Sequence, residues 1–140
     1  MLFMARAKYH PLLQAGRAPS LVQASSGLGQ YIRPGFGGYA TAKAGLIAVT
    51  KTLALEWAPG IRVNAVGPGA VDTAFLRGGT GRSDEAQPLH FALDSYTNAI
   101  PMKRLAVPDD VAGPIMFLLG SDSAYMTGQV LWINGGAYMP

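Results

Sequence analysis

The sequence predicts an α/β fold with a parallel sheet, and two observations carry that prediction. Short apolar runs with the composition of buried strands lie at 21–24, 62–66 and 130–133. A long helical segment, 39–57, joins the first run to the second. A strand, a helix and a second strand in that order form a unit whose strands are parallel and whose crossover is right-handed.

The segments that precede the long helix are expected to be a helix, the first strand and a loop. Residues 1–15 have a helical pattern that Pro11 interrupts. Residues 27–38 contain five glycines and one proline, which is typical of a loop. The 39–57 helix is apolar in almost every direction around its axis, so we expect it to be covered on both sides.

The segments that follow the second strand are expected to be a long loop, a helix and the last strand. Residues 73–98 show little periodicity and are predicted to be solvated loop, with a substrate lid over 74–100. A helix is predicted over 108–119, because Pro108 favours the first helical position and two aspartates follow it.

Composition restricts the class of protein. The chain has 140 residues, 49% of them hydrophobic and 14% charged, as in one modest globular domain. It has no cysteine, which fits a cytoplasmic location, and His10 and His90 have no ligand-spaced partner, so we expect no metal site. The net charge of +3 is scattered, and no apolar run has the roughly 18 residues of a membrane span. We therefore expect neither nucleic acid nor a membrane as a partner.

A tyrosine and a lysine stand four residues apart in the long helix, at Tyr39 and Lys43. This spacing places both side chains on one face, about one turn apart. An ammonium near a phenol favours the phenolate and lowers the pKa of the tyrosine, which lets it exchange a proton near neutral pH. Alone, the pair is also typical of ordinary exposed neighbours on a helix.

Further motifs accompany this pair in a fixed order. Ser26 lies thirteen residues before Tyr39, at the end of the first strand. A Gly-Pro-Gly-Ala-Val-Asp-Thr run follows the second strand at 67–73, and two more motifs lie at 125–130 and 134–136. In this order and spacing, the sequence from about Phe3 to Gly136 resembles the C-terminal part of a short-chain dehydrogenase/reductase.

The resemblance implies the C-terminal half of a doubly wound, Rossmann-like parallel sheet, forming a single partial domain over 1–140. Its parts are a helix at 1–15, a β-α-β catalytic unit at 20–66, a nicotinamide and substrate loop at 67–107, and a terminal helix and strand at 108–140.

The resemblance also implies a role for each motif residue. Tyr39 is the expected general acid/base, and Lys43 is expected to lower its pKa and to bind the cofactor ribose. Ser26 is expected to hold the substrate oxygen, although a serine there also suits a turn that closes the strand. The expected cofactor is NAD or NADP, the choice being open, and the residues expected to bind it are Tyr39, Lys43, Pro68, Gly69, Val71 and Thr73. Phe36, Phe75 and Leu76 are expected to line the substrate pocket, with simple core packing as an equal alternative.

The function implied by the resemblance is NAD(P)-dependent oxidation or reduction of an alcohol/carbonyl pair on a small molecule. A 3-oxoacyl carrier-protein reductase is the alternative within this class. The Gly-rich turn that binds the pyrophosphate in the family has no counterpart in the sequence. We therefore expect these 140 residues alone to bind dinucleotide weakly and to be inactive. A truncated, non-catalytic product or an oligomerisation module is the alternative from another class.

The chain is also expected to form a homodimer or homotetramer through the Tyr39–Trp57 helix. The outward stripe of this helix is predicted to carry the small residues Ala40, Ala44 and Ala48, which permit close approach of a second helix.

Overall fold

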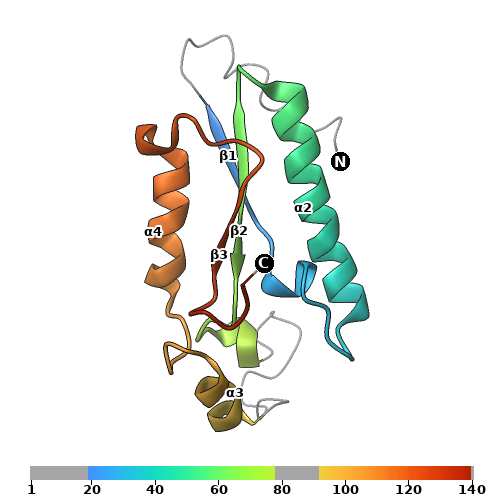
Figure 1. Cartoon of the computed structure of the whole chain (residues 1–140), viewed down its shortest axis with the longest axis vertical. Helices are drawn as coiled ribbons and strands as arrows, with labels where there is room; N and C mark the ends of the chain where they lie inside the picture. Colours follow the sequence, from blue (N-terminus) through green and yellow to red (C-terminus); the bar gives the residue numbers. More distant parts are fainter. Residues whose placement is uncertain (1–18, 78–91, 140) are drawn as a thin grey trace.

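A three-stranded parallel sheet is the central element of the structure. The computed structural model describes residues 19–77 and 92–139. Its strands are β1 (Ser20–Ala24), β2 (Arg62–Pro68) and β3 (Val130–Ile133), in the spatial order β1-β2-β3 (Figure 1). Both strand pairs are parallel, so the predicted α/β class and pairing are confirmed.

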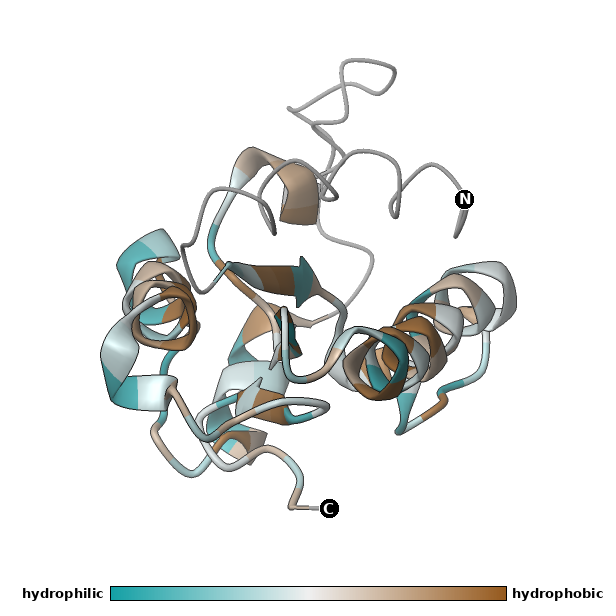
Figure 2. Ribbon diagram, turned by 90° about the horizontal axis from the view of Figure 1, so that it is seen from above, coloured by the Kyte–Doolittle hydropathy of each residue, from teal (hydrophilic) through white to brown (hydrophobic). Residues whose placement is uncertain are grey.

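One long helix covers each face of the sheet. Helix α2 (Gly37–Trp57) lies on one face and α4 (Pro108–Leu119) on the other, as Figures 1 and 2 show from two directions. Parallel sheets need such cover on both faces, because their strands are apolar on both sides. The bounds of α4 agree with the prediction. Helix α2 begins two residues earlier than predicted and ends at the predicted residue.

The core is built on the central strand, β2. Val63 is fully buried and packs with Leu53, Ala54 and Ile61 beneath α2. Leu118 of α4 is also fully buried, on the opposite face. The register pairs Leu21 with Val63, which brings the first strand into the same apolar layer. The near-continuous apolar character of β2 therefore reflects burial on both faces.

The outward face of α2 differs from the predicted one. Ala40 is only 2% exposed, so it does not belong to an outer stripe with Ala44 and Ala48. Residues four apart rotate by about 40° per step around a helix with 3.6 residues per turn, so such a row drifts off one face. The exposed positions of α2 in the structure are Gly37, Gly38, Thr41, Ala42, Gly45, Ala48, Lys51, Thr52, Leu55 and Glu56.

The 73–98 segment contains more regular structure than predicted. A 3-10 helix, η2, spans Ala74–Arg77, and a short helix, α3, spans Leu93–Ala99. Two helical turns are too short to give a detectable amphipathic pattern, and α3 is followed by the buried Ile100. The predicted loop is therefore wrong at these two places.

Two predictions fall on residues outside the described ranges. The helix at 1–15 is one, and the central part of the 74–100 lid, at 78–91, is the other. Among the helices of residues 19–77 and 92–139, none is both long and apolar enough to cross a membrane.

Candidate active site

The candidate site lies at the carboxyl end of β1, where the chain turns into a 3-10 helix and later into α2. The 3-10 helix, η1 (Gly27–Gly29), follows the strand directly and packs beside the N-terminal turns of α2 (Figure 1). In open parallel sheets, ligands bind in the crevice outside the carboxyl ends of the strands. The three residues expected to be catalytic come from these neighbouring elements.

Lys43 is tied to the end of β1 at two points. Its Nζ donates a hydrogen bond to the Ala24 carbonyl at 2.9 Å. Its own backbone carbonyl accepts a hydrogen bond from the Ser25 hydroxyl at 2.8 Å, and Ser25 is only 5% exposed. The first bond orients the ammonium and the second fixes the helix against the strand, so the charge is held in place at the strand end.

Tyr39 lies beside this ammonium. The Lys43 Nζ is 5.5 Å from the centre of the Tyr39 ring, which is within the range of a cation–π contact. The two side chains therefore lie on one side of α2, as their four-residue spacing predicts.

Ser26 caps the 3-10 helix that follows it. Its Oγ accepts a hydrogen bond from the Leu28 N–H at 3.3 Å, so the turn-closing role considered from the sequence is present. That bond uses a lone pair of the oxygen and leaves the hydroxyl proton able to donate to another acceptor. The cap therefore orients Ser26 without consuming its donor.

Gly29 allows η1 to approach α2 this closely. A Cβ built on Gly29 would lie 2.9 Å from the Lys43 carbonyl carbon and 3.1 Å from the Ala44 nitrogen. Both neighbours are backbone atoms that cannot move aside, so any larger residue would separate η1 from the helix. The distance between the Ser26 turn and Lys43 thus depends on a glycine at this position.

The loop expected to bind nicotinamide begins at the end of β2 and is held by its neighbours. The Gly69 N–H donates to the Ile133 carbonyl at 2.9 Å. Val71 forms an isolated parallel bridge with Ala106, and the Thr73 hydroxyl donates to the Val71 carbonyl at 3.4 Å. Because its N–H is already bonded, Gly69 could contact a cofactor only through its carbonyl or its Cα.

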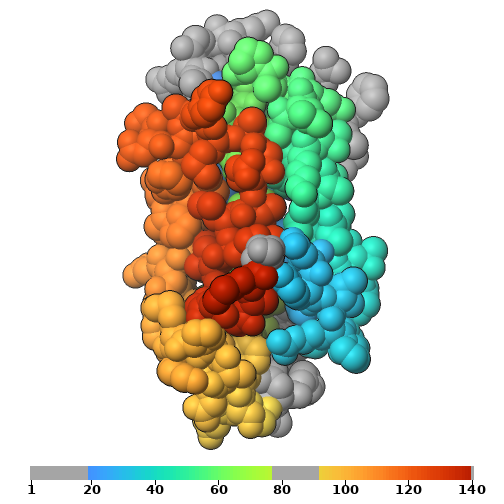
Figure 3. Space-filling view, viewed as in Figure 1, coloured from blue at the N-terminus to red at the C-terminus, as the bar shows by residue number. Residues whose placement is uncertain are grey.

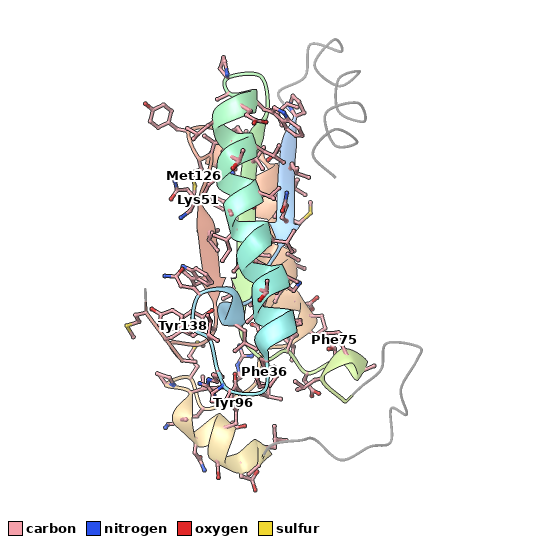
Figure 4. All side chains as sticks on the ribbon, turned by 90° about the vertical axis from the view of Figure 1, so that its right-hand side faces the viewer. Phe36, Lys51, Phe75, Tyr96, Met126 and Tyr138 are labelled. Atoms are coloured by element: carbon pink, nitrogen blue, oxygen red, sulfur yellow. The ribbon has the colours of Figure 1, made fainter. Side chains whose placement is uncertain are left out.

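The three residues expected to line the substrate pocket lie at the same end of the molecule. Phe36 precedes α2, and Phe75 and Leu76 lie in η2. Phe36 is 45% exposed and Phe75 is 61% exposed, and Figure 4 shows both rings near the end of the molecule where α2 begins. Such exposure does not fit simple core packing for the two phenylalanines.

A cavity of about 140 Å³ lies beside the loop, and none of the predicted site residues lines it. Its lining includes Ala70, Ile133, Asn134, Arg104 and Asp110.

Arg104 donates to both carboxylate oxygens of Asp110, at 2.6 and 2.9 Å. This hydrogen-bonded pair lowers the pKa of Asp110 to about 2. Asp110 also accepts from the Val107 N–H and so caps α4.

Two residues near the site carry contacts that sequence reasoning did not find. The sequence prediction assigned a role to Ser26 and none to the adjacent Ser25, although two consecutive serines at a strand end are a detectable signal. Tyr138 lies far along the chain and packs on both the Ser26 turn and the end of β2. Burial raises the pKa of the Tyr138 hydroxyl.

In residues 19–77 and 92–139, no three side chains of the metal-ligating types form a group that could hold an ion.

The arrangement fits the ring and ribose end of a nicotinamide dinucleotide. A fixed ammonium at Lys43 and a hydroxyl at Tyr39 can meet the hydroxyl groups of a ribose. Gly69 packs against the segment after β3, where a Cβ would lie 3.2 Å from the Asn134 Cα. The residues present therefore suit this group.

Comparisons with known proteins identify the family of the chain. A family profile described as enoyl-(acyl carrier protein) reductase matches residues 1–138. The 3-oxoacyl-[acyl-carrier-protein] reductase FabG of Thermotoga maritima is 41% identical over 127 residues, which are 90% of this chain and 48% of that protein. The chain thus spans about half the length of this relative.

Solved structures give the same result. The ligand-free aldohexose dehydrogenase of Thermoplasma acidophilum matches with a TM-score of 0.83 and 29% identity, over 99% of this chain and 56% of that one. ElxO with NADP bound matches with a TM-score of 0.79 and 31% identity, over 97% of this chain and 52% of that one. From the profile match, the identities and the shared fold, the chain belongs to the short-chain dehydrogenase/reductase family.

Proposed function

We propose that this chain is the catalytic part of an NAD(P)-dependent oxidoreductase that interconverts an alcohol and a carbonyl compound. The observation that carries the proposal is the fixed position of Lys43, bonded to the end of β1 and beside the Tyr39 ring. The hydroxyls of Ser26 and Tyr39 and a held cation near the carboxyl end of a parallel strand are the kinds of group that such a reaction needs. A cytoplasmic location belongs to the same proposal, since a cysteine-free chain fits a reducing compartment.

Each of the three residues has a distinct task in this proposal. Ser26 donates its hydroxyl proton to the substrate oxygen and stabilises the negative charge that develops there. Tyr39 gives its phenolic proton to that oxygen during reduction and takes it back during oxidation. Lys43 holds its ammonium near the charge that proton transfer leaves on Tyr39. Nicotinamide, when bound, supplies or accepts the hydride.

The cofactor in the proposal is NAD or NADP, without a choice between them. Lys43 and Tyr39 would hold the ribose, and the loop of Pro68, Gly69, Val71 and Thr73 would hold the nicotinamide. Support comes from the similar ElxO structure, which has NADP bound. Phe36, Phe75 and Leu76 would form an apolar wall for the substrate.

The substrate class is proposed to be a small alcohol or ketone. The 41% identity to a 3-oxoacyl-[acyl-carrier-protein] reductase favours a 3-oxoacyl thioester as the second candidate. Both can be assayed with the same enzyme, using a simple ketone series and acetoacetyl-CoA as probes. Turnover of the thioester at least about a hundredfold better in kcat/KM would favour the second candidate, since that ratio reflects differential binding of the transition state.

The test of the catalytic role uses a chimera. The N-terminal half of the Thermotoga maritima relative is joined to the present chain, and reduction is followed by NADPH and NADH absorbance. We expect Tyr39→Phe to lower kcat by about 10²- to 10⁴-fold, because it removes the acid/base proton but keeps the ring. Tyr125→Phe is the matched control, because Tyr125 is fully exposed and lies in the segment before β3, outside the candidate site. Retention of most activity in Tyr39→Phe would overturn the assignment.

Self-association is the second part of the proposal. The outward face of α2 carries the small residues Gly45 and Ala48, and Leu55 on the same face is 85% exposed. Such a face allows two helices to approach closely in a symmetric homodimer or homotetramer. We expect Ala48→Glu to convert the oligomer to a monomer in light scattering, while Ser95→Glu on the exposed surface of α3 leaves the mass unchanged. A monomeric unmodified chain at tens of micromolar would contradict this part.

The non-catalytic alternative makes the opposite prediction for the chimera. If the chain serves only for assembly, the unmodified chimera is inactive with every carbonyl probe, while the chain still forms a defined oligomer. Activity that depends on Tyr39 would exclude this alternative.

A further inference from the structure

The C-terminal segment folds back onto the candidate site, and Tyr138 is its point of contact. A methyl group added at Gly27 would overlap the Tyr138 ring and hydroxyl. Gly27 directly follows Ser26, so Tyr138 packs on the turn that carries this serine. Figure 4 shows Tyr138 beside η1, near the start of α2. In Figure 3 the dark red C-terminal segment lies directly against the blue segment that follows β1.

Tyr138 also touches the end of β2, where the nicotinamide loop begins. Its hydroxyl lies 3.5 Å from the Gly67 carbonyl, a long hydrogen bond. Gly67 itself has no room for a side chain, because a Cβ there would overlap the Trp132 ring. Trp132 in turn meets Tyr138 edge to face, with ring centres 5.6 Å apart and planes at 73°. One phenol thus bridges the Ser26 turn and the residue that precedes Pro68.

A third aromatic ring completes the contact. Tyr31, which follows η1, lies with its ring centre 4.3 Å from that of Tyr138. Its hydroxyl donates to the Met139 carbonyl at 2.8 Å. Aromatic pairs of this kind attract each other beyond the area they bury. Both sides of η1 are therefore attached to the C-terminal segment.

The segment that presents Tyr138 is itself fixed. The Asn134 amide nitrogen donates to the Tyr138 carbonyl at 2.9 Å, and the Asn134 side-chain oxygen accepts from the Gly136 N–H at 2.9 Å. Gly135 and Gly136 adopt positive φ angles of 63° and 84°, a conformation that glycine tolerates best. The turn after β3 therefore aims Tyr138 back at the site.

We infer that Tyr138 is a positioning residue that fixes the Ser26 turn relative to the loop that begins at Gly67. Its catalytic consequence rests on the proposed function, in which Ser26 meets the substrate and the loop meets the cofactor. The distance between these two contacts must be right for transfer between the bound groups, and a misplacement of about 1 Å can cost about a hundredfold in rate. The ring supplies most of this effect, since the hydroxyl contact is long.

The inference is tested first without any activity, by amide hydrogen exchange on the 140-residue chain. In Tyr138→Ala we expect the amides of Gly29, Gln30 and Tyr31, which bond to Ser26 and Gly27 carbonyls, to exchange about tenfold faster or more. Amides at the centre of α2 should keep their rates. Tyr138→Phe keeps the ring and should behave like the unmodified chain, as should Tyr125→Ala at a fully exposed tyrosine. If Tyr138→Ala fails to fold, Tyr138→Leu replaces it.

A double-variant cycle isolates the contact with Gly27. Gly27→Ala alone should accelerate exchange of the same amides, because the new methyl displaces the ring. In a Tyr138→Ala background it should have little further effect, which marks direct coupling between the two positions. Equal acceleration throughout the chain, no acceleration, or additive effects would each overturn the inference.

Kinetics of the chimera separate positioning from a merely structural role. We expect Tyr138→Ala to lower kcat by about 10- to 100-fold with KM changed less than about threefold, and Tyr138→Phe to restore kcat. A rise in KM alone would contradict positioning. If the unmodified chimera is inactive, the proposed function fails, but the exchange experiment still decides whether Tyr138 fixes the Ser26 turn.

Discussion

Two adjacent serines at the end of β1 illustrate how single residues divide the work of the site. The Ser25 hydroxyl is buried and spent on the Lys43 carbonyl. The Ser26 hydroxyl is only partly buried and keeps its proton available for a ligand. In this division, Ser25 fixes α2 against the end of β1, and Ser26 has the hydroxyl that we propose meets the substrate.

This division predicts different effects of the two alanine substitutions on stability and on activity. Ser25→Ala removes the second donor of the Lys43 carbonyl, which also accepts within α2, and should lower the free energy of unfolding by about 0.5–1.5 kcal/mol. Ser26→Ala removes only a long capping bond, so it should cost about 0.5–1 kcal/mol of stability while abolishing most activity of the chimera. Urea denaturation and kcat measured on both variants check this. A larger stability loss in Ser26→Ala than in Ser25→Ala would contradict the assignment.

At the scale of elements, an arginine in β2 holds α4 against the sheet. The Arg62 guanidinium donates to the carbonyls of Leu118 at 3.1 Å, Gly120 at 3.0 Å and Ser123 at 2.8 Å. These carbonyls lie at the end of α4 and in η3 (Ser121–Ser123), where the helix leaves its last acceptors unpaired. The positive charge also suits the negative end of the helix dipole.

Replacement of this guanidinium should therefore loosen α4. We expect Arg62→Met to lower the free energy of unfolding by about 1.5–3 kcal/mol, because a charged donor shared by three carbonyls is lost, although each carbonyl keeps another donor. Arg33→Met is the matched control at an exposed arginine and should change stability by less than about 0.5 kcal/mol. Thermal or urea unfolding measures both, and equal effects would show that Arg62 is not a special donor.

The elements themselves could be predicted because their signals are local. The apolar runs, the flanking glycines and prolines, and the Tyr39–Lys43 spacing all lie within a few residues of one another. The contacts of Arg62 with Ser123 and of Tyr138 with Gly27 join residues far apart in the sequence, so no local pattern reveals them. Ala40 was wrongly predicted to lie on the outward face of α2. When a helix is apolar in every direction, its sequence does not show which side packs on the sheet. Helix α3 was missed because two turns leave no periodicity.

At the scale of the molecule, the described sheet has β2 at its centre and β1 at one side. Within residues 19–77 and 92–139, β1 pairs only with β2. The chain covers 56% of the Thermoplasma acidophilum structure and 52% of ElxO with NADP bound. Those proteins therefore contain nearly as much chain again beyond the matched part.

The proposed cofactor contacts all lie at one end of a dinucleotide. In the proposed function, Tyr39, Lys43 and the loop from Pro68 hold the nicotinamide and its ribose, whereas the sequence holds no Gly-rich turn after a strand for the pyrophosphate. Because the pyrophosphate contacts normally supply much of the binding energy, we expect the 140-residue chain to bind NADH and NADPH with Kd weaker than about 1 mM, and the chimera to bind one of them at about micromolar Kd.

Fluorescence titration of both dinucleotides against both proteins measures this difference, which corresponds to about 4 kcal/mol of binding free energy. Lys43→Met in the chimera is the control for the ribose contact. We expect this variant to bind dinucleotide more weakly than the unmodified chimera but more tightly than the 140-residue chain alone. Micromolar binding by the chain alone would contradict the prediction. It would mean that the backbone of the Ser26 turn or the loop beyond β2 binds phosphate in place of the Gly-rich turn.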